Sequence, residues 1–574
     1  MQRPKTLLAS GAGAAAANGL YKEEGLYKGV PKYVHENGQL WVLRYRLRSG
    51  RYWWYIADKD QLDVDDGDLY RIQSAAELPP LFCPWSKARD GILPGPVLTE
   101  VAADGSALEL EAGVAARSVR DYNAMDAIAS VLRSGDVAFV RASYLLELSA
   151  SNKILPRRQD LPAHAMVSAP MLERLLDELD MVARCQRQHE MLFPGCVIVS
   201  YAWGDKGHPD KHGEMLSQVL APAIEWYLSE RAAFVANDGC RGTRSVASAW
   251  WRDARAHAAD GHDFGLFLDY GSLHQHERSA TETAAFRRAL NSMDVFYSHK
   301  ATVVWRLTRS LSGQMNATSL PYDARGWPYF ETCIAGLVKP RLMVLDLGRA
   351  DWMQPLGLYK WDNDAAEFVQ AGLQEPIAFT GVMKPAGELA RQASYTSCFN
   401  LGVLGAVLDQ RPPPVVPSVF EKDVHKQTFT NNSDVKAVIA LQRRVSLTVL
   451  SAAKWLQFDT MGWGVDQVDG IIAAVHLAPR LETLNLEYNT LRDEGAIALA
   501  EHLKKGLPIQ KLSLSNNKIG DAGLAAIFDA CAGRALPNLR QLSCMNNEVG
   551  ERARASLKRL TQARPSVEVK CISV

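Results

Sequence analysis

A short motif that recurs near the end of the chain constrains the fold more than any other feature. Leucine stands at its first and third positions, except that the third copy has Cys544 at the third, and asparagine stands at its sixth, in residues 484–489, 512–517 and 542–547. Successive asparagines are 28 and 30 residues apart, and Leu456-Gln-Phe458 begins an atypical first unit 28 residues before Leu484. A fixed period of this length predicts stacked units that bury one continuous core.

Between the copies, apolar residues recur at helical spacing, so each unit is predicted to be a strand followed by a helix. We expect the alternating leucines to fill the core and each asparagine to satisfy backbone groups where its strand turns. The pattern resembles the ribonuclease-inhibitor-like class of leucine-rich repeats over residues 453–574. Alternate strand positions point the same way, which predicts a concave face formed by Thr483, Asn485, Glu487, Lys511, Ser513, Ser515, Gln541, Ser543 and Met545. For protein binding we select Asn485, Glu487, Lys511, Ser513 and Ser515.

Residues 191–400 alternate short apolar runs with amphipathic helical patterns. The four apolar runs are predicted to be adjacent parallel strands, at residues 197–200, 264–269, 301–307 and 341–347. Uninterrupted apolar strands separated by helices indicate a parallel sheet that is covered on both faces. Ligands of such sheets bind beyond the carboxyl ends of the strands.

Four polar blocks lie at or near these strand ends. They contain Ser200 and Trp203, Asp269 and Gln275, Met293 and Tyr297, and Arg325, Trp327 and Glu331. In this order they resemble the fungal heterokaryon-incompatibility (HET) domain, a family that is itself similar to Toll/interleukin-1 receptor (TIR) domains. The chain departs from the family patterns at residues 271–274, at Phe330, where the HET family has glutamine, and at Pro328, where plant-type TIR domains have cysteine. The resemblance implies a flavodoxin-type α/β domain that associates with itself or with partners.

The same resemblance implies that Glu331 corresponds to the glutamate with which TIR enzymes cleave NAD. A carboxylate beside the ribose can stabilise an oxocarbenium-like state. Trp327 and Glu331 are four residues apart and are predicted to share one helix face. Tyr201 and Trp203 are expected to stack on a ring of the ligand, with Asp269 and Trp327 as further ligand-binding residues.

We expect Glu331 to be partly accessible at the floor of a cleft near Tyr201 and Asp269, with Trp327 in the core. Arg325 is the nearest cation in the sequence if the carboxylate is buried. The alternative is that Glu331 has only a structural role at the start of its helix.

Other groupings are less specific. The pairs His208/His212 and His274/His276 lack the further ligands of a zinc site, and Ser200 or Ser272 with His274 lacks the Gly-x-Ser-x-Gly turn of a hydrolase. The sequence contains neither phosphate-binding glycine loop in its expected setting. We therefore predict no metal and no bound cofactor, with NAD only as a candidate substrate.

The flanking regions complete the predicted layout. Residues 21–100 are predicted to form a β-rich module with a hairpin at residues 40–56 and a tryptophan-rich core or ligand cage. Its acidic run, Asp63, Asp65, Asp66 and Asp68, is either a solvated turn or a calcium site that lacks the EF-hand glycine and glutamate. Residues 1–20 are expected to be a disordered tail, residues 101–190 a helical connector, and residues 401–452 a proline-rich linker.

Composition excludes several functional classes. The chain has 64 basic and 64 acidic residues, which argues against a nucleic-acid or membrane-surface binder. The nine cysteines are scattered, and no apolar stretch reaches the length of a membrane span. We predict a reduced, cytoplasmic, multidomain α/β and α+β protein. Its predicted function is protein interaction or signalling, and the alternative is NAD cleavage at Glu331.

Overall fold

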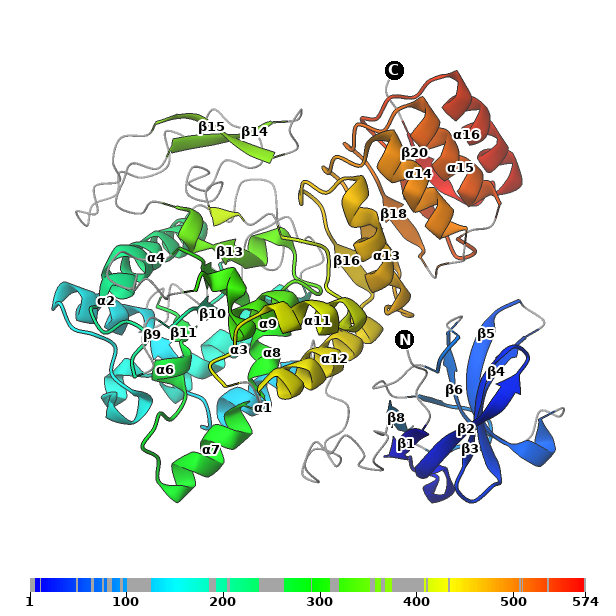
Figure 1. Cartoon of the computed structure of the whole chain (residues 1–574). Helices are drawn as coiled ribbons and strands as arrows, with labels where there is room; N and C mark the ends of the chain where they lie inside the picture. The colour runs from blue at the N-terminus through cyan, green and yellow to red at the C-terminus, as the bar shows by residue number, and fades with distance from the viewer. Residues whose placement is uncertain are drawn as a thin grey trace. The chain divides into compact units, whose positions relative to one another are not determined.

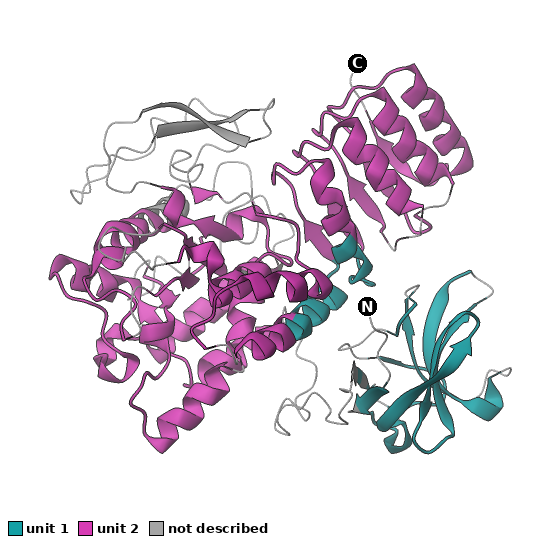
Figure 2. Ribbon diagram, viewed as in Figure 1, with its two compact units in different colours: residues 1–121, 443–454, 473–481 teal, residues 122–442, 455–472, 482–574 magenta. Residues whose placement is uncertain are grey.

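Figure 1 shows the computed structural model of the chain. The structure describes residues 6–10, 12–47, 50–62, 67–74, 77–79, 85–92, 96–100, 125–184, 193–203, 207–236, 263–290, 292–309, 320–350, 357–362, 367–373, 407–408, 411–431, 434–504, 507, 509–533 and 536–571. The chain divides into two compact units (Figure 2). One comprises residues 1–121, 443–454 and 473–481, and the other comprises residues 122–442, 455–472 and 482–574.

The amino-terminal part of the first unit is an antiparallel sheet in the order β7-β6-β5-β4-β3-β2-β1-β8. Its strands are β1 (Thr6–Ser10), β2 (Gly19–Tyr27), β3 (Val30–His35), β4 (Leu40–Arg46), β5 (Tyr52–Asp58), β6 (Asp68–Gln73), β7 (Ser86–Lys87) and β8 (Val97–Glu100). The predicted hairpin is confirmed, because β4 and β5 pair from Leu40↔Asp58 to Arg46↔Tyr52.

The structure corrects two expectations for the amino-terminal region. The expected disordered tail is wrong for residues 6–10, because β1 pairs with both β2 and β8. Alternate residues of this strand face the core, since Leu7 and Ala9 are buried. The tryptophans divide between two environments: Trp54 and Trp85 are core residues, whereas Lys32 lies over the Trp41 ring and Arg71 over the Trp53 ring. The chain's own cations thus cover rings that a ligand cage would need free. Asp63, Asp65 and Asp66 lie outside the described residues.

The second unit contains a five-stranded sheet in the order β13-β12-β10-β11-β9. Its strands are β9 (Val140–Arg141), β10 (Cys196–Tyr201), β11 (Gly265–Phe267), β12 (Val303–Leu307) and β13 (Val344–Asp346). The last four are parallel neighbours, which confirms the predicted pairing of the four apolar runs. By chain order these four run 2-1-3-4, and the order reverses between β10 and β12. In doubly wound folds such a reversal marks the ligand crevice.

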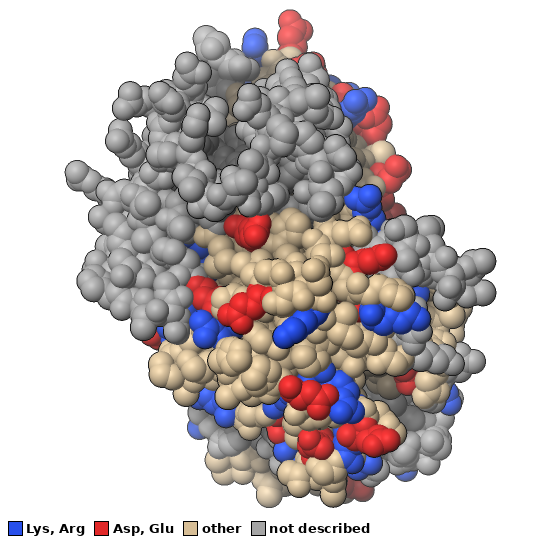
Figure 3. Space-filling model, turned by 90° about the vertical axis from the view of Figure 1, so that its left-hand side faces the viewer, with Lys and Arg blue, Asp and Glu red and all other residues tan. Residues whose placement is uncertain are grey.

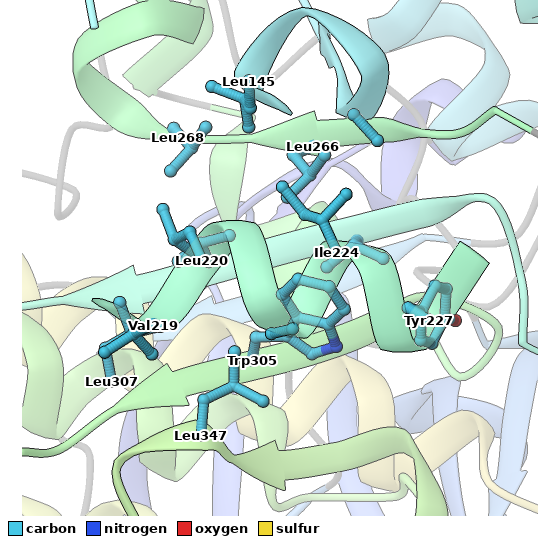
Figure 4. Close-up of a cluster of buried hydrophobic side chains, with 14 of the residues drawn as sticks. Leu145, Val219, Leu220, Ile224, Tyr227, Leu266, Leu268, Trp305, Leu307 and Leu347 are labelled. Carbon is cyan, nitrogen blue, oxygen red and sulfur yellow. The ribbon is translucent and has the colours of Figure 1, made fainter. Parts of the chain in front are cut away.

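One face of this sheet packs on a single apolar layer. Figure 4 shows Leu266, Trp305 and Leu307 from the strands against Leu220 and Ile224 from the helical segment above them. That segment consists of a π-helical turn, Leu216–Leu220, and α4 (Ala221–Ala236). Successive strand residues alternate between faces, so the intervening positions point to the opposite side of the sheet. The other helices of this domain are α6 (Asp269–Ser272), α7 (Ala280–Leu290), α8 (Met293–Ser298) and α9 (Gly326–Ala335).

The predicted connector is part of this domain. Its helices are α1 (Met125–Arg133), α2 (Ala142–Ala150) and α3 (Ala169–Arg184), and its short strand β9 pairs antiparallel with β11. Val140 and Leu145 lie in the same core as β10 and α4. Residues 125–184 have the helical character expected of the connector, whereas β9 was not expected, because a two-residue strand carries no periodic signal in the sequence.

The predicted linker is largely ordered. It contains α11 (Pro417–Asp423), a 3-10 turn at Val424–Lys426, and α12 (Asp434–Ala452). Before it, β14 (Gly357–Asp362) and β15 (Glu367–Leu373) form an antiparallel hairpin. The proline-rich sequence thus precedes a helical region, and the expected linker is corrected to residues 411–416.

The carboxy-terminal region forms a parallel sheet in the order β16-β17-β18-β19-β20. Its strands are β16 (Trp455–Gln457), β17 (Thr483–Asn485), β18 (Lys511–Ser513), β19 (Gln541–Ser543) and β20 (Glu568–Lys570), and its helices are α13 (Val468–His476), α14 (Arg492–Leu503), α15 (Asp521–Ala532) and α16 (Glu551–Ala563). Leu484, Leu512 and Leu542 are buried, as predicted. We call residues 455–472 and 482–571 the arc.

The motif asparagines form a ladder through the arc. Asn489 donates to the carbonyl oxygens of Phe458 and Leu486 at 2.8 and 2.9 Å and accepts from the Met461 and Trp463 amides at 3.0 Å. Asn517 donates in the same way to the Leu486 carbonyl at 2.7 Å. The predicted role of the asparagines is confirmed, because each satisfies backbone groups where a strand turns.

None of the described helices is both long and apolar enough to cross a bilayer.

Candidate functional site

A row of polar side chains crosses the carboxyl ends of three neighbouring parallel strands. Ser200, Arg306 and Asp346 are in register on β10, β12 and β13 and lie on the face opposite the apolar layer of Figure 4. All three are buried. The row spans the point at which the strand order reverses, which is where a doubly wound sheet places its ligand site.

Glu331 of α9 meets this row. The Ser200 hydroxyl donates to the Glu331 carboxyl, and the Tyr322 hydroxyl lies 2.5 Å from Ser200 Oγ. Because Ser200 has a single proton, Tyr322 must donate to Ser200 when Ser200 donates to Glu331. The hydroxyl of Tyr297, from α8, also hydrogen-bonds the Glu331 carboxyl. We call Ser200, Tyr297, Tyr322 and Glu331 the carboxyl cluster.

Burial controls the charge of this cluster. Only 8% of Glu331 is exposed, and this burial raises the pKa of its carboxyl from the usual 4.5 to about 8. The hydrogen bond from Ser200 lowers the pKa in part, and the nearby charge of Asp269 raises it further. Burial likewise raises the pKa of Tyr322 to about 12. Glu331 is therefore mostly protonated at neutral pH, as a buried carboxyl without a cationic partner is expected to be.

A second group forms around Asp269, at the start of α6. Its carboxylate accepts from the Tyr201 hydroxyl, from Trp203 Nε1 at 2.8 Å and from the Tyr270 amide at 2.7 Å. Burial raises the pKa of Asp269, while these three donors lower it. Tyr201, Trp203 and Asp269, which sequence analysis selected as ligand-binding residues, are therefore brought together. The rings of Trp203 and Tyr270 then meet edge to face at 5.6 Å.

Two expected residues have other partners. Trp327 is only partly buried, and its Nε1 donates to Asp434 of α12 at 3.1 Å, so it is not an anchor in the core. Arg325 donates to the Trp203 carbonyl at 2.7 Å and to the Leu320 carbonyl at 3.1 Å. The expectation that Glu331 is partly accessible is wrong. The residue is buried, because its carboxyl is hydrogen-bonded to Ser200 of β10.

Sequence analysis missed Tyr322, Arg306 and Asp346. The Arg306 guanidinium carbon lies 5.3 Å from the centre of the Tyr322 ring, and its Nη2 lies 3.2 Å from Asp323. Asp346 accepts from Thr308 Oγ1 at 2.7 Å. Polar residues at alternate positions of otherwise apolar strands, just before the strand ends, were the signal that could have identified Arg306 and Asp346.

The five residues that sequence analysis selected for protein binding differ in their exposure. Asn485 and Ser515 are buried. Asn485 donates to Gln457 Oε1 at 3.0 Å, and Ser515 Oγ lies 2.8 Å from Ser543 Oγ, so both link neighbouring repeats. The strand register pairs Lys511 with Thr483 rather than with Glu487, and Ser513 with Asn485. Lys511 is exposed, and Ser513 and Glu487 are partly exposed.

The comparisons with known proteins concern the arc. A family model for leucine-rich repeats matches residues 479–500 and 508–528. These residues contain β17, β18 and most of α14 and α15. Leucine-rich repeats commonly mediate protein binding. No curated protein matches the chain.

The described residues were compared with the requirements of a metal site, and one face of the molecule with those of a one-signed surface. No three His, Cys, Asp or Glu side chains gather there into a group that could hold a metal ion. On the face shown in Figure 3, acidic and basic side chains lie next to one another among uncharged residues. This view gives no sign of an electrostatic surface for a highly charged partner.

Proposed function

We propose that the protein acts in protein interaction or signalling, with the arc as its partner-binding region. The observation that carries this proposal is the in-register row Thr483, Lys511 and Gln541 at the starts of β17, β18 and β19, in which Lys511 is exposed. Side chains at equivalent positions of parallel strands face the same side of the sheet. A partner bound to that side would contact consecutive repeats.

The test is charge reversal in the row. Lys511→Glu should weaken the capture of a partner by the purified, immobilised protein by tenfold or more, since a like-charge contact costs on the order of 1.4 kcal/mol or more. The matched control is Lys504→Glu, an exposed lysine just after α14 that pairs with Glu501. Quantitative pull-down compares the variants, and melting curves verify that both fold. Equal capture by both variants would show that the arc is structural.

We further propose that the central α/β domain, which resembles HET and TIR domains, is the assembly or effector module. The parallel strand order 2-1-3-4 and the position of the carboxyl cluster at its reversal support this assignment. An assembly module should self-associate as its concentration rises. Sedimentation velocity of the purified protein over a hundredfold concentration range tests this, and a single unchanging monomer would contradict it.

A second candidate function is NAD cleavage at Glu331. The observation in its favour is a carboxyl group with a pKa of about 8 at the reversal of strand order, hydrogen-bonded to Ser200 and Tyr297. The protonated form cannot supply the negative charge that stabilises an oxocarbenium ion. Catalysis would therefore require a change that ionises Glu331, such as opening of the cluster to water.

Nicotinamide release from NAD tests the second candidate directly. If Glu331 is catalytic, the purified full chain releases nicotinamide and Glu331→Gln abolishes the release. The control is Glu277→Gln, since Glu277 is exposed in the same domain. Release that persists in the Glu331 variant, or no release by the wild type from pH 6 to 9, would exclude this function.

A further inference from the structure

The segment between the central domain and the arc is attached at both ends. We call residues 411–431 together with Asp434 the strap. At its beginning, Arg411 Nη2 donates to the Lys339 carbonyl, and the Arg411 carbonyl accepts from Trp463 Nε1 of the arc at 2.8 Å. A Cβ atom on Gly470 of α13 would lie 2.9 Å from Pro413, so Pro413 packs directly against that helix. The strap therefore begins in contact with both the central domain and the first repeat.

The later part of the strap holds α9, the helix that carries Glu331. Thr428 is hydrogen-bonded on both sides of Arg325: its amide donates to the Ala324 carbonyl, and its carbonyl accepts from the Gly326 amide, both at 2.9 Å. A Cβ atom on Gly326 would lie 2.1 to 2.3 Å from the Phe429 ring, so glycine is required for the ring to sit on the helix start.

Two further contacts extend this attachment along α9. The Phe420 ring stacks on Tyr329, with ring centres 5.3 Å apart and planes inclined by 11°. Asp434 accepts from Trp327 Nε1 at 3.1 Å. The strap thus contacts the first turn and a half of α9, immediately before Glu331.

The arc end of the strap is continuous with the asparagine ladder. The same Trp463 that donates to Arg411 also donates its backbone amide to Asn489 Oδ1 at 3.0 Å. Beside it, Arg341 donates to the Thr460 carbonyl. Thr460 is held at φ +58°, a left-handed conformation that is costly for a β-branched residue. The first repeat is therefore fixed to the central domain by backbone positions that depend on the ladder.

We propose that the strap is a conformational link that couples the arc to α9, so that a partner bound to the arc changes the stability of the helix that carries Glu331. This inference rests on the proposed role of the arc in partner binding. Coupling between distant sites requires a physically connected element on which both sites act. Here the connected element runs from Asn489 through Trp463 and Arg411 to Thr428, Phe429 and α9.

Amide hydrogen exchange of the full chain tests the link without a partner. Trp463→Phe removes the indole N–H that the Arg411 carbonyl accepts and keeps a smaller aromatic ring at this buried position. The variant should speed hydrogen exchange of the α9 amides roughly threefold to tenfold, although residue 463 lies in the arc and not in α9. Phe429→Ala acts at the other end of the strap and should speed the same amides by at least as much. The matched control is Trp41→Phe, the same change in the amino-terminal module, which should leave α9 unchanged.

The outcomes separate the link from the proposed function. Faster exchange in α9 for both Trp463→Phe and Phe429→Ala supports the link. If Trp463→Phe alters exchange only near residues 455–463, the strap holds α9 in place but does not couple it to the arc, and the proposed link is wrong. Because Phe429→Ala removes a large ring, Asp434→Ala provides a second variant at that end, and melting curves identify any variant that fails to fold. A link that holds while Lys511→Glu leaves capture unchanged would contradict only the partner-binding proposal.

Discussion

The buried environment of Glu331 makes the stability of the fold depend on pH. Its carboxyl has a pKa of about 8 in the folded chain and about 4.5 when exposed. The folded state therefore binds one more proton than the unfolded state between these values. Stability falls as pH rises across that window, because the proton must be lost from the buried group or the fold must open. Above about pH 8 the effect of this group is constant.

The variant Glu331→Gln should remove this dependence. Glutamine resembles the protonated carboxyl and does not ionise, so the variant and the wild type should have similar stability at pH 5. Between pH 5 and 8 the variant should become more stable than the wild type by on the order of 1 kcal/mol per pH unit. Urea unfolding at several pH values measures the difference.

The exposed residue Glu277 provides the comparison for this experiment. Glu277→Gln should show no difference from the wild type that grows across the same pH window. A difference between Glu331→Gln and the wild type that stays constant from pH 5 to 8 would mean that Glu331 is ionised in the folded chain.

The sequence predicted which residues approach the strand ends better than it predicted their exposure. Tyr201, Trp203 and Asp269 meet because the carboxyl ends of parallel strands share one edge, which the apolar runs reveal. The burial of Glu331 depends on Ser200 and Tyr322, and the latter lies 122 residues from Ser200 in the chain. The partner of Trp327 is 107 residues away. Neither separation leaves a local pattern that sequence analysis could use.

At the scale of elements, the asparagine ladder allows a prediction with an internal control. Asn517 is buried and donates to three carbonyl oxygens, including that of Leu514 at 3.1 Å. Asn517→Ala should lower the free energy of unfolding by about 2–4 kcal/mol, since buried backbone groups lose their partner.

The adjacent residue gives the comparison. Asn516 is only partly buried, and its side chain accepts from Asn546 at 3.0 Å. It is also held at φ +57°, where alanine is less favourable than asparagine. Asn516→Ala should therefore cost only about 1 kcal/mol. Equal costs at the two positions in chemical denaturation would mean that the ladder does not stabilise the arc.

Helices and strands could be predicted where an apolar pattern extends over many residues, and they were missed where the pattern is short. The four parallel strands and the repeats carry apolar patterns over many residues, and both were found. β9 has two residues, and β1 has five residues and is followed by a segment rich in alanine and glycine, so neither has a recognisable strand signal. The order of α11 and α12 comes from tertiary packing such as that of Phe420 on Tyr329, which the proline-rich sequence before them does not show.

At the scale of the whole molecule, the arc and the central domain are expected to unfold together. Arg411 connects them, because its guanidinium donates to the Lys339 carbonyl and its own backbone carbonyl accepts from Trp463 Nε1. Arg411→Ala removes the first bond and keeps the second, which belongs to the backbone. The variant should weaken the connection by about 1–3 kcal/mol and lower the melting temperature of the arc more than that of the central domain. Calorimetry should then resolve two transitions where the wild type shows one for these regions.

Arg552→Ala is the control for this experiment, because Arg552 is exposed on α16 and its side chain is far along the arc from the first repeat. It should leave the calorimetric trace unchanged. If Arg411→Ala also leaves the trace unchanged, the two regions are coupled through other contacts.

The left-handed residues of the arc have a consequence for how this chain could vary in length. Thr460, Tyr488, Asn516 and Asn546 occupy the same position in successive repeats, at φ between 55° and 58°. These four units therefore end their strands with the same backbone geometry, on which the next unit packs. A duplicated unit of 28 residues inserted between β18 and β19 would find both of its neighbours already shaped for it. The number of repeats is thus free to change by whole units, while the junction at Trp463 and the carboxyl cluster stay as they are.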